Sequence, residues 1–350
     1  NRTGNTTVNA DISGSGALTV TGGGDLTLLG NYSAGGVYIL NGTFQIGNGG
    51  TTGSIWISPI QIATNGQFII NRSDDVSLDM TIGDYAVGEH GRFSSIGSGT
   101  TTIIGSAAYT GNTTVNNGSL VFSRTVGPST SGFFGNGSLT IEPNASAFDQ
   151  AFYTGNYTFA STLTGLTIGN STSTANANLT VNGTALSVAG NVGLYGGNVS
   201  LNTGLTTTIS GIVRLLGNTN VTQNVSGVIT TTGLALMSGN VSLTSASNNV
   251  TTIAAQNVSG LSFKNAGNLT VGTVNPTGIN VTGPVNITVD SGNISLTEAI
   301  ITTDTSTSAI VLNAGAGTAA GTATGGNILV SVNGTVSVGT GGRATLYTGS

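Results

Sequence analysis

The only stretch of this chain that could supply acid–base chemistry lies between residues 71 and 92. Glycosidases need paired carboxylates at a set separation, and other carbohydrate-active enzymes combine an acid with a basic residue and often a metal ion. The chain has twelve acidic residues and one histidine, and this stretch holds five of the acids together with that histidine. The candidates are Asp74, Asp75, Asp79, Asp84, Glu89, His90 and Arg92.

A solvated loop or bulge is the alternative interpretation of this stretch, and we favour it. Neighbouring aspartates close to an arginine, as in Arg72, Asp74 and Asp75, are common on protein surfaces. The acids also do not recur on the repeats described below, as a catalytic groove would require. We therefore expect no catalytic residues and no enzymatic activity.

Other motifs that could hold a cofactor or a metal ion are equally weak. Residues 22–25 (Gly-Gly-Gly-Asp) resemble a calcium-binding glycine turn, but the β-roll that uses such turns repeats them every nine residues or so, and here the motif occurs once. The glycines lack the lysine and the following helix of a phosphate-binding loop. We expect no cofactor and no bound metal.

The composition indicates a folded protein that is rich in β-structure. Charged residues make up only 5% of the chain, against about 25% in an ordinary domain, yet 37% of the residues are hydrophobic and the net charge is only −5. This combination does not fit intrinsic disorder. No apolar run approaches the roughly 18 residues of a membrane-spanning helix. Seven scattered basic residues argue against nucleic-acid binding, and the absence of cysteine excludes a disulfide framework.

Residues 14–46 show the local pattern on which the whole chain is built. Apolar and polar residues alternate over 17–20 and 26–28, and glycine runs separate these segments. Residues 108–122 repeat the last part of this stretch. Alternation of period two predicts strands, and glycine or Asn-Gly predicts the turns between them. We expect Trp56, the only tryptophan, to lie in the core or beneath a loop.

A shorter unit, Gly-Asn-apolar-Ser/Thr-apolar, recurs with uneven spacing from about residue 166 to the end. Short strands with frequent turns and self-similarity at tens of residues predict a solenoid. A sandwich or closed barrel is the rival fold, but a single core rarely grows beyond about 250–300 residues. We predict an all-β, single-stranded parallel β-helix (β-solenoid), an elongated rod that is continuous over 1–350. Its style changes near residue 160, between coils 1–160, with a charged insertion near 71–92, and coils 161–350.

The first part of the chain, about residues 1–125, resembles the autotransporter-associated β-strand repeat. The resemblance rests on GSGALTVTGGGDLTLLG and NYSAGGVYILNGTFQIGNGGTTGSI at 14–54 and on the partial copy at 108–122. The chain departs from the usual Thr-Gly-Gly-Thr-Thr run, with Ala-Gly-Gly-Val-Tyr at 34–38. Residues 166–350 are similar to the repeats of filamentous-haemagglutinin-type adhesins. These resemblances imply a right-handed parallel β-helix in a large secreted bacterial surface protein.

These observations predict a non-catalytic structural or adhesive rod on the bacterial cell surface, outside the cell. The expected partners are the continuing chain or another copy at the ends, since an uncapped solenoid exposes strand edges there. A host cell, a neighbouring cell or surface glycans are expected along the sides, and end-to-end association would build a filament or matrix fibre. The alternative is a β-helical carbohydrate-active enzyme, either a polysaccharide lyase or a glycosidase.

About two dozen Asn-X-Ser/Thr sequons raise the hypothesis of N-glycosylation. Part of their number has a simple origin, because alternation in Gly-Asn-Val-Ser-Leu places Asn and Ser together on the outer face. The same geometry exposes the asparagine to a transferase, and the resemblance implies that bacterial enzymes can glycosylate such proteins. The sites singled out are Asn41, Asn112, Asn136, Asn198, Asn240, Asn268 and Asn293.

Overall fold

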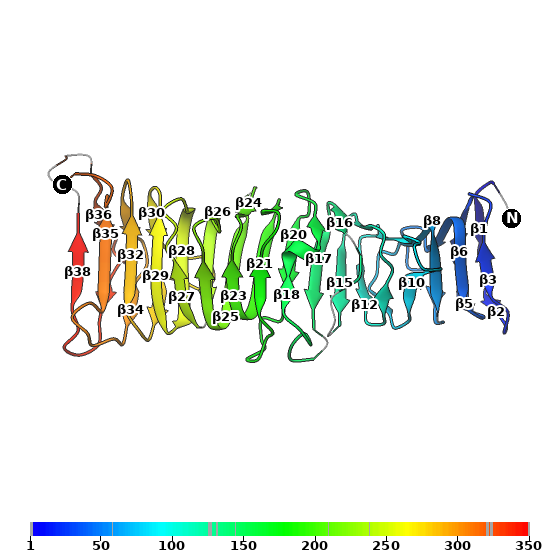
Figure 1. Cartoon of the computed structure of the whole chain (residues 1–350), viewed down its shortest axis with the longest axis horizontal. Helices are drawn as coiled ribbons and strands as arrows, with labels where there is room; N and C mark the ends of the chain where they lie inside the picture. Colours follow the sequence, from blue (N-terminus) through cyan, green and yellow to red (C-terminus); the bar gives the residue numbers. More distant parts are fainter. Residues whose placement is uncertain are drawn as a thin grey trace. The chain divides into compact units, whose positions relative to one another are not determined.

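The computed structural model describes residues 3–57, 59–124, 128–130, 132–143, 145–208, 210–237, 239–319, 322 and 325–348. These residues form parallel strands stacked as a β-solenoid of about 14 turns (Figure 1). The only helical element among them is one 3-10 turn, η1 (Thr154–Asn156). The predicted all-β parallel solenoid is confirmed. No helix among the described residues is long and apolar enough to cross a membrane.

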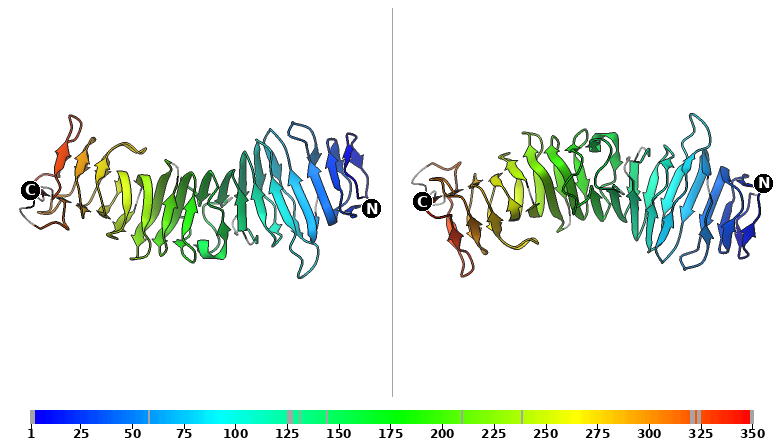
Figure 2. Two further views of the ribbon diagram at one scale, coloured as in Figure 1. Left: turned by 90° about the horizontal axis from the view of Figure 1, so that it is seen from above. Right: turned by 90° about the horizontal axis from the view of Figure 1, so that it is seen from below.

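The chain divides into two compact units. Unit 1 comprises residues 1–149 and 156–168, and unit 2 comprises 150–155 and 169–350. Figure 2 shows the successive coils lying side by side within each unit. The continuity of one solenoid over 1–350 stays a prediction.

The strands of unit 1 are β1 (Thr6–Val8), β2 (Ile12–Ser13), β3 (Leu18–Val20), β4 (Asp25–Leu28), β5 (Asn31–Ser33), β6 (Val37–Ile46), β7 (Ser54–Ile55), β8 (Ile60–Ile70), β9 (Val76–Leu78), β10 (Ile82–Asp84), β11 (Arg92–Ser95), β12 (Thr100–Ile103), β13 (Ala107–Ala108), β14 (Thr113–Val115), β15 (Ser119–Ser123), β16 (Gly132–Gly135), β17 (Ser138–Glu142), β19 (Thr158–Phe159) and β20 (Gly165–Ile168).

The strands of unit 2 are β18 (Phe152–Tyr153), β21 (Leu179–Val181), β22 (Leu186–Val188), β23 (Asn191–Leu201), β24 (Leu205–Thr207), β25 (Ile212–Gln223), β26 (Ile229–Met237), β27 (Asn240–Leu243), β28 (Asn249–Val258), β29 (Gly260–Asn265), β30 (Leu269–Val271), β31 (Ile279–Val281), β32 (Val285–Val289), β33 (Ile294–Leu296), β34 (Ile300–Thr302), β35 (Ile310–Ala314), β36 (Ile328–Val330), β37 (Val336–Ser337) and β38 (Ala344–Tyr347).

Each strand pairs with its counterpart on the next coil, so equivalent side chains stack above one another. Unit 1 has an eleven-stranded sheet whose main path runs through β1, β4, β6, β8, β11, β14, β16 and β19, with β3, β10 and β13 paired beside this path. Its interior carries a column of rings in which Phe68 lies between Phe44 and Phe93, with ring centroids 6.0 and 5.7 Å away. All three rings are fully buried. The parallel register therefore turns the alternation of each strand into a continuous core.

Unit 2 has aliphatic columns in place of the aromatic one. Val199 pairs with Val221, and Val221 pairs with Val241 on the coil after that. These side chains are at most 1% exposed, whereas Ser200, between the inward residues of β23, is half-buried. Burial of apolar surface is the main stabilising contribution of such columns.

The observed position of Trp56 contradicts the prediction that this residue lies in the core or beneath a loop. Its side chain is 75% exposed, and its indole Nε1 donates a hydrogen bond to Ser54 Oγ at 3.0 Å. The physical reason is the alternation itself. Ile55 at the end of β7 is buried, so the next residue points to the opposite face. Hydrophobicity alone therefore gave the wrong side for this residue.

Corners of the coil need glycine where the backbone turns sharply against the coil below. Gly42 in β6 has φ +102°, and a Cβ at this position would collide with the carbonyl oxygen of Gly24. A residue with a side chain would be strained there by both its backbone conformation and this contact. Gly42 pairs in register with Gly66 of β8, and β8 pairs in turn with β11.

Candidate functional site

Within the charged stretch, residues 85–91 form a loop that leaves the coil between β10 and β11, here called the 85–91 loop. Asp84 closes its base: its Oδ1 accepts a hydrogen bond from the backbone N–H of Gly91 at 2.8 Å, and its Oδ2 accepts one from Thr110 Oγ1 at 2.7 Å. Residues 76–78 and 82–84, by contrast, are strands paired in register with neighbouring coils. The loop itself contains no strand.

Glu89 and His90 tie the loop to both adjacent coils. The Glu89 carboxylate accepts hydrogen bonds from the hydroxyl and the backbone N–H of Thr64, and these bonds lower the pKa of Glu89. The backbone N–H of His90 donates to Thr64 Oγ1 at 3.0 Å, and its Nδ1 lies 2.9 Å from Thr110 Oγ1. The loop is therefore held in one position by its own acidic and imidazole groups.

Gly91 returns the chain from the loop to β11. A Cβ on Gly91 would lie 2.5 Å from the Cβ of Ile62 on the coil below. Non-bonded carbon atoms in a closely packed interior do not approach so closely, so one of the two segments would have to shift. Glycine at this position is what lets the loop close against β8.

A polar depression, here called the corner groove, lies beside the loop where β8, β11 and β14 turn the corner. Its volume is about 650 Å³. The guanidinium of Arg92 has no hydrogen-bond or ion-pair partner within the part of the chain that the structure describes, and none of the lining residues is acidic. The lining residues are Thr64, Asn65, His90, Arg92, Thr110, Gly111, Asn112 and Ser129.

A second depression of about 510 Å³ is lined by residues of the loop and shares His90 and Thr110 with the corner groove. Asp84 and Glu89 also line it. Near it Tyr85, in the loop, packs edge-on against Tyr38 of β6, with ring centroids 6.1 Å apart. Tyr85 is 44% exposed, and Val87 at the loop tip is fully exposed. The surface beside the second depression thus combines exposed aromatic and aliphatic side chains with the two carboxylates of Asp84 and Glu89.

The remaining acids of the stretch lie elsewhere and are engaged locally. Asp74 forms an ion pair with Arg72, with Oδ2 and Nη2 2.6 Å apart, and the hydrogen bonds from Arg72 lower the pKa of Asp74. Asp75 Oδ1 accepts a hydrogen bond from the backbone N–H of Thr100 at 2.9 Å. Asp79 is exposed.

Of the seven charged candidates, the structure brings four together at the loop: Asp84, Glu89, His90 and Arg92. The acids of this group accept hydrogen bonds that shape the loop, and neither Asp84 nor Glu89 lines the corner groove. Across the described ranges, no three histidine, aspartate or glutamate side chains are grouped closely enough to hold a metal ion. The arrangement can bind a ligand through a cation, amides and hydroxyls.

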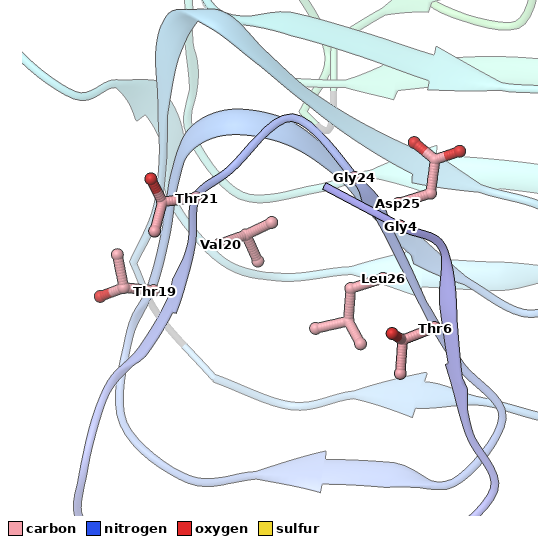
Figure 3. Close-up of a pocket in the computed structure, with 8 residues that line it drawn as sticks. All are labelled: Gly4, Thr6, Thr19, Val20, Thr21, Gly24, Asp25 and Leu26. Carbon is pink, nitrogen blue, oxygen red and sulfur yellow. The ribbon is translucent and has the colours of Figure 1, made fainter. Parts of the chain in front are cut away.

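A small cavity of about 130 Å³ lies at the first described coil of unit 1. Figure 3 shows Thr6, Val20 and Leu26 pointing toward one another inside this coil. The Thr6 hydroxyl is buried without a hydrogen-bond partner among the described residues. Strand β1 pairs only with β4 in the described part of the unit. Among the described residues, the other edge of β1 therefore has no strand partner.

The predicted glycosylation sites fall into two groups. Asn198 belongs to a ladder in which its Nδ2 donates to Asn178 Oδ1 and its Oδ1 accepts from Asn220 Nδ2, each at 2.9 Å. In a second ladder, Asn268 Oδ1 accepts from the backbone N–H of Asn293 at 2.7 Å. Here the asparagine stabilises the corner of each coil, which is a structural reason for the repeated Gly-Asn pair.

In the second group, Asn240 pairs in register with Asn220 of the first ladder but makes no ladder hydrogen bond. Asn41 and Asn240 are exposed and have no side-chain hydrogen bond to another described residue. Asn136 is exposed, and its Oδ1 lies 3.4 Å from the backbone N–H of Asn117. Asn112 is exposed and lines the corner groove.

Reasoning from the sequence missed Asn65 and Ser129 as members of the groove, and it missed the exposure of Trp56. Neither Asn65 nor Ser129 belongs to a charged motif, so no composition signal marks them. Trp56 could have been placed outside from the alternation of β7.

The comparisons with family models, curated proteins and solved structures returned no match to this chain.

Proposed function

We propose that this chain is a non-catalytic structural or adhesive part of a secreted bacterial cell-surface protein. The observation that carries the proposal is the use made of the acids in the charged stretch. Asp84 and Glu89 line the second depression, but their carboxylate oxygens accept hydrogen bonds from Gly91, Thr110 and Thr64 that hold the loop in place. An acid–base pair for hydrolysis or elimination must instead face its substrate. The groove offers binding groups rather than a catalytic pair.

A polysaccharide depolymerisation assay tests the non-catalytic part of the proposal. The 350-residue chain is incubated with neutral and acidic polysaccharides, and new reducing ends and unsaturated sugar products are measured. We expect neither product. Turnover that disappears in Asp84→Asn or Asp79→Asn, with the circular dichroism spectrum of the variant unchanged, would show that the protein is a carbohydrate-active enzyme.

The cell-surface part is tested on the organism that makes the protein and with coated beads. Antibody raised against the chain should label intact cells, and beads coated with the chain should attach to cells or to their extracellular material. Labelling that requires permeabilised cells contradicts the proposed location. Beads that attach no better than albumin-coated beads contradict the adhesive role.

Association through the ends of the solenoid is the second part of the proposal. In unit 1, the unpaired edge of β1 and the buried hydroxyl of Thr6 support it. In unit 2, strands β36, β37 and β38 each have a described partner on one side only. Exposed strand edges invite pairing with another chain. The last described coil also carries the exposed apolar side chains of Leu329, Val330, Val332, Leu346 and Tyr347.

Sedimentation velocity over a concentration series tests end association. The wild-type chain should form larger species as its concentration rises, and Leu346→Lys should reduce them because a charge on an exposed edge opposes pairing. Val225→Lys is the matched control, since Val225 is 85% exposed in a turn away from β36–β38. A wild-type chain that stays monomeric throughout, or an equal effect of both substitutions, refutes association through this edge.

N-glycosylation remains part of the proposal, with the exposed and unengaged Asn41 and Asn240 as the preferred acceptors. A glycan on Nδ2 of Asn198 would replace one of the two hydrogens of an amide that donates within its ladder. Peptide mapping of the native protein by mass spectrometry should find higher occupancy at Asn41 and Asn240 than at Asn198. An intact mass equal to that of the polypeptide refutes the modification.

A further inference from the structure

We propose that the corner groove binds a polysaccharide that carries carboxylates, with Arg92 as the residue that recognises the acidic sugar. The inference rests on the proposed function and names the class of ligand for it. It starts from an unusual feature of the groove: an exposed guanidinium in a hollow with no carboxylate on its walls. In the described part of the chain, the two ion pairs involve Arg72 and Lys264, not Arg92.

The surroundings of Arg92 keep this cation available. The acids nearest in the chain, Asp84 and Glu89, accept hydrogen bonds from Thr110 and Thr64 and thereby hold the loop. Their carboxylates are occupied by neutral donors of the coil corner and not by the guanidinium. Although the protein as a whole is acidic, with a net charge of −5, the walls of this groove are lined by one cation, one histidine and neutral groups.

The other groups in the groove fit the hydroxyls of a sugar. The Asn65 amide and the Ser129 hydroxyl line the groove without a side-chain partner among the described residues. The His90 ring is held by Thr110 at Nδ1, which leaves Nε2 for a ligand. Amides and hydroxyls both donate and accept hydrogen bonds, as sugar hydroxyls do.

The volume of the corner groove and the presence of the second depression beside it favour a polymer over a small anion. The volume of about 650 Å³ exceeds that of a single small ion and is in the range of small-molecule sites. The second depression shares His90 and Thr110 and lies near the Tyr38–Tyr85 pair, whose rings can pack against the apolar face of a sugar. Asp84 and Glu89 also line the second depression and would repel a carboxylate there, so the acidic group of the ligand is assigned to the corner groove and a neutral part of the sugar chain to the surface past the 85–91 loop.

Arginine selects the acidic group on this ligand. Its planar fork matches a carboxylate with two parallel hydrogen bonds, whereas a lysine would act as a point charge. The groove therefore predicts preference for a polysaccharide of uronic-acid type over a neutral one of the same length.

Isothermal titration calorimetry of the 350-residue chain tests this inference, with oligogalacturonate as the probe and a maltooligosaccharide of equal length as the neutral comparison. Wild type should bind the oligogalacturonate and not the maltooligosaccharide, and added sodium chloride should weaken binding. Arg92→Gln should weaken binding by about ten-fold or more, and Arg92→Lys by less, because one charge-assisted bidentate contact is lost or simplified.

Arg343→Gln is the matched control, because Arg343 is an exposed arginine of unit 2 whose removal changes the net charge equally. It should bind like wild type. The Arg92 side chain is exposed and has no hydrogen-bond or ion-pair partner among the described residues, so Arg92→Gln should keep the circular dichroism spectrum of wild type. The inference is overturned if no oligogalacturonate binds, if the neutral oligomer binds equally, or if the two glutamine variants bind alike.

The bead-attachment assay, run on the same variants, separates this inference from the proposed function. Beads that attach with wild type and with Arg92→Gln alike, while no oligogalacturonate binds in solution, overturn the ligand assignment but leave an adhesive role standing. Beads that fail to attach with any variant contradict the adhesive role itself.

Discussion

Replacement of Phe68 by alanine should remove the centre of the aromatic column in unit 1. The ring is fully buried, stacks on Phe44 and is tilted against Phe93, with ring centroids 6.0 and 5.7 Å away. Truncation of a buried phenylalanine costs about 3–5 kcal/mol through lost burial and the cavity left behind. Each ring pair contributes about 0.5–1.5 kcal/mol beyond its burial. With two such pairs lost, we expect a cost near the upper end, about 4–5 kcal/mol.

Hydrogen exchange followed by mass spectrometry is the suitable assay, because it reports local opening free energies and does not assume a two-state transition for a solenoid. Coils in a repeat fold contact mainly their neighbours. Loss of protection in Phe68→Ala should therefore centre on β6, β8 and β11, while β25 to β32 of unit 2 keep theirs. Phe68→Leu should lose less, since most of the volume is retained.

Phe134→Ala is the matched control, because Phe134 in β16 is only half-buried and faces the outer side of its strand. It should cost less than half as much as Phe68→Ala. A double-mutant cycle of Phe44→Leu and Phe68→Leu should give a coupling of about 0.5–1.5 kcal/mol. Equal costs for the two alanine variants, together with zero coupling, would refute the account of the column as the core of unit 1.

Three further predictions concern the loop and the exposed tryptophan. Gly91→Ala should destabilise the 85–91 loop by about 1–3 kcal/mol through overpacking against Ile62, measured as lost exchange protection, whereas Gly83→Ala, whose Cβ would make only an ordinary 3.7 Å contact, should not. Hydrogen bonds from Thr64 lower the pKa of Glu89 from its ordinary 4.5, so these bonds stabilise the loop fully above about pH 4.5 and the stabilisation is lost as the pH falls through the lowered pKa of the folded state. Exchange protection of the loop should therefore fall below pH 4.5 in wild type. An identical acid response in Glu89→Gln would contradict this prediction. Trp56 should emit at long wavelength and be quenched by acrylamide in the native protein nearly as strongly as in urea; a blue-shifted, protected emission would place it in the core after all.

The fold class follows from the sequence because its signal is local. Alternation of apolar and polar residues decides which side chains face inward, and it does so within a single strand. Val199 and Leu201 are buried and Ser200 between them is half-buried, as the pattern predicts. Glycine and asparagine at the turns, with repeats at tens of residues, were sufficient to choose a solenoid over one large core.

The polar contacts of the core could not be predicted in this way. Asn248 is fully buried, although its residue type favours turns and surfaces. Its Oδ1 accepts from the backbone N–H of Ile229 at 2.9 Å, and its Nδ2 donates to the carbonyl oxygen of Lys264 at 3.0 Å. Both partners belong to other segments of the coil, so only the folded chain shows that this amide is satisfied inside the protein.

The corner groove depends in the same way on how the coils align. Glu89 meets Thr64 and His90 meets Thr110 because residues 25 and 20 positions apart stack at one corner. The spacing differs from coil to coil: asparagine ladder contacts join residues 20, 25 and 34 positions apart. The sequence by itself determined the inward and outward faces of the strands, since that choice is made residue by residue. The tertiary structure alone decided which corners coincide and which charged groups meet, because turns of unequal length set the register between coils.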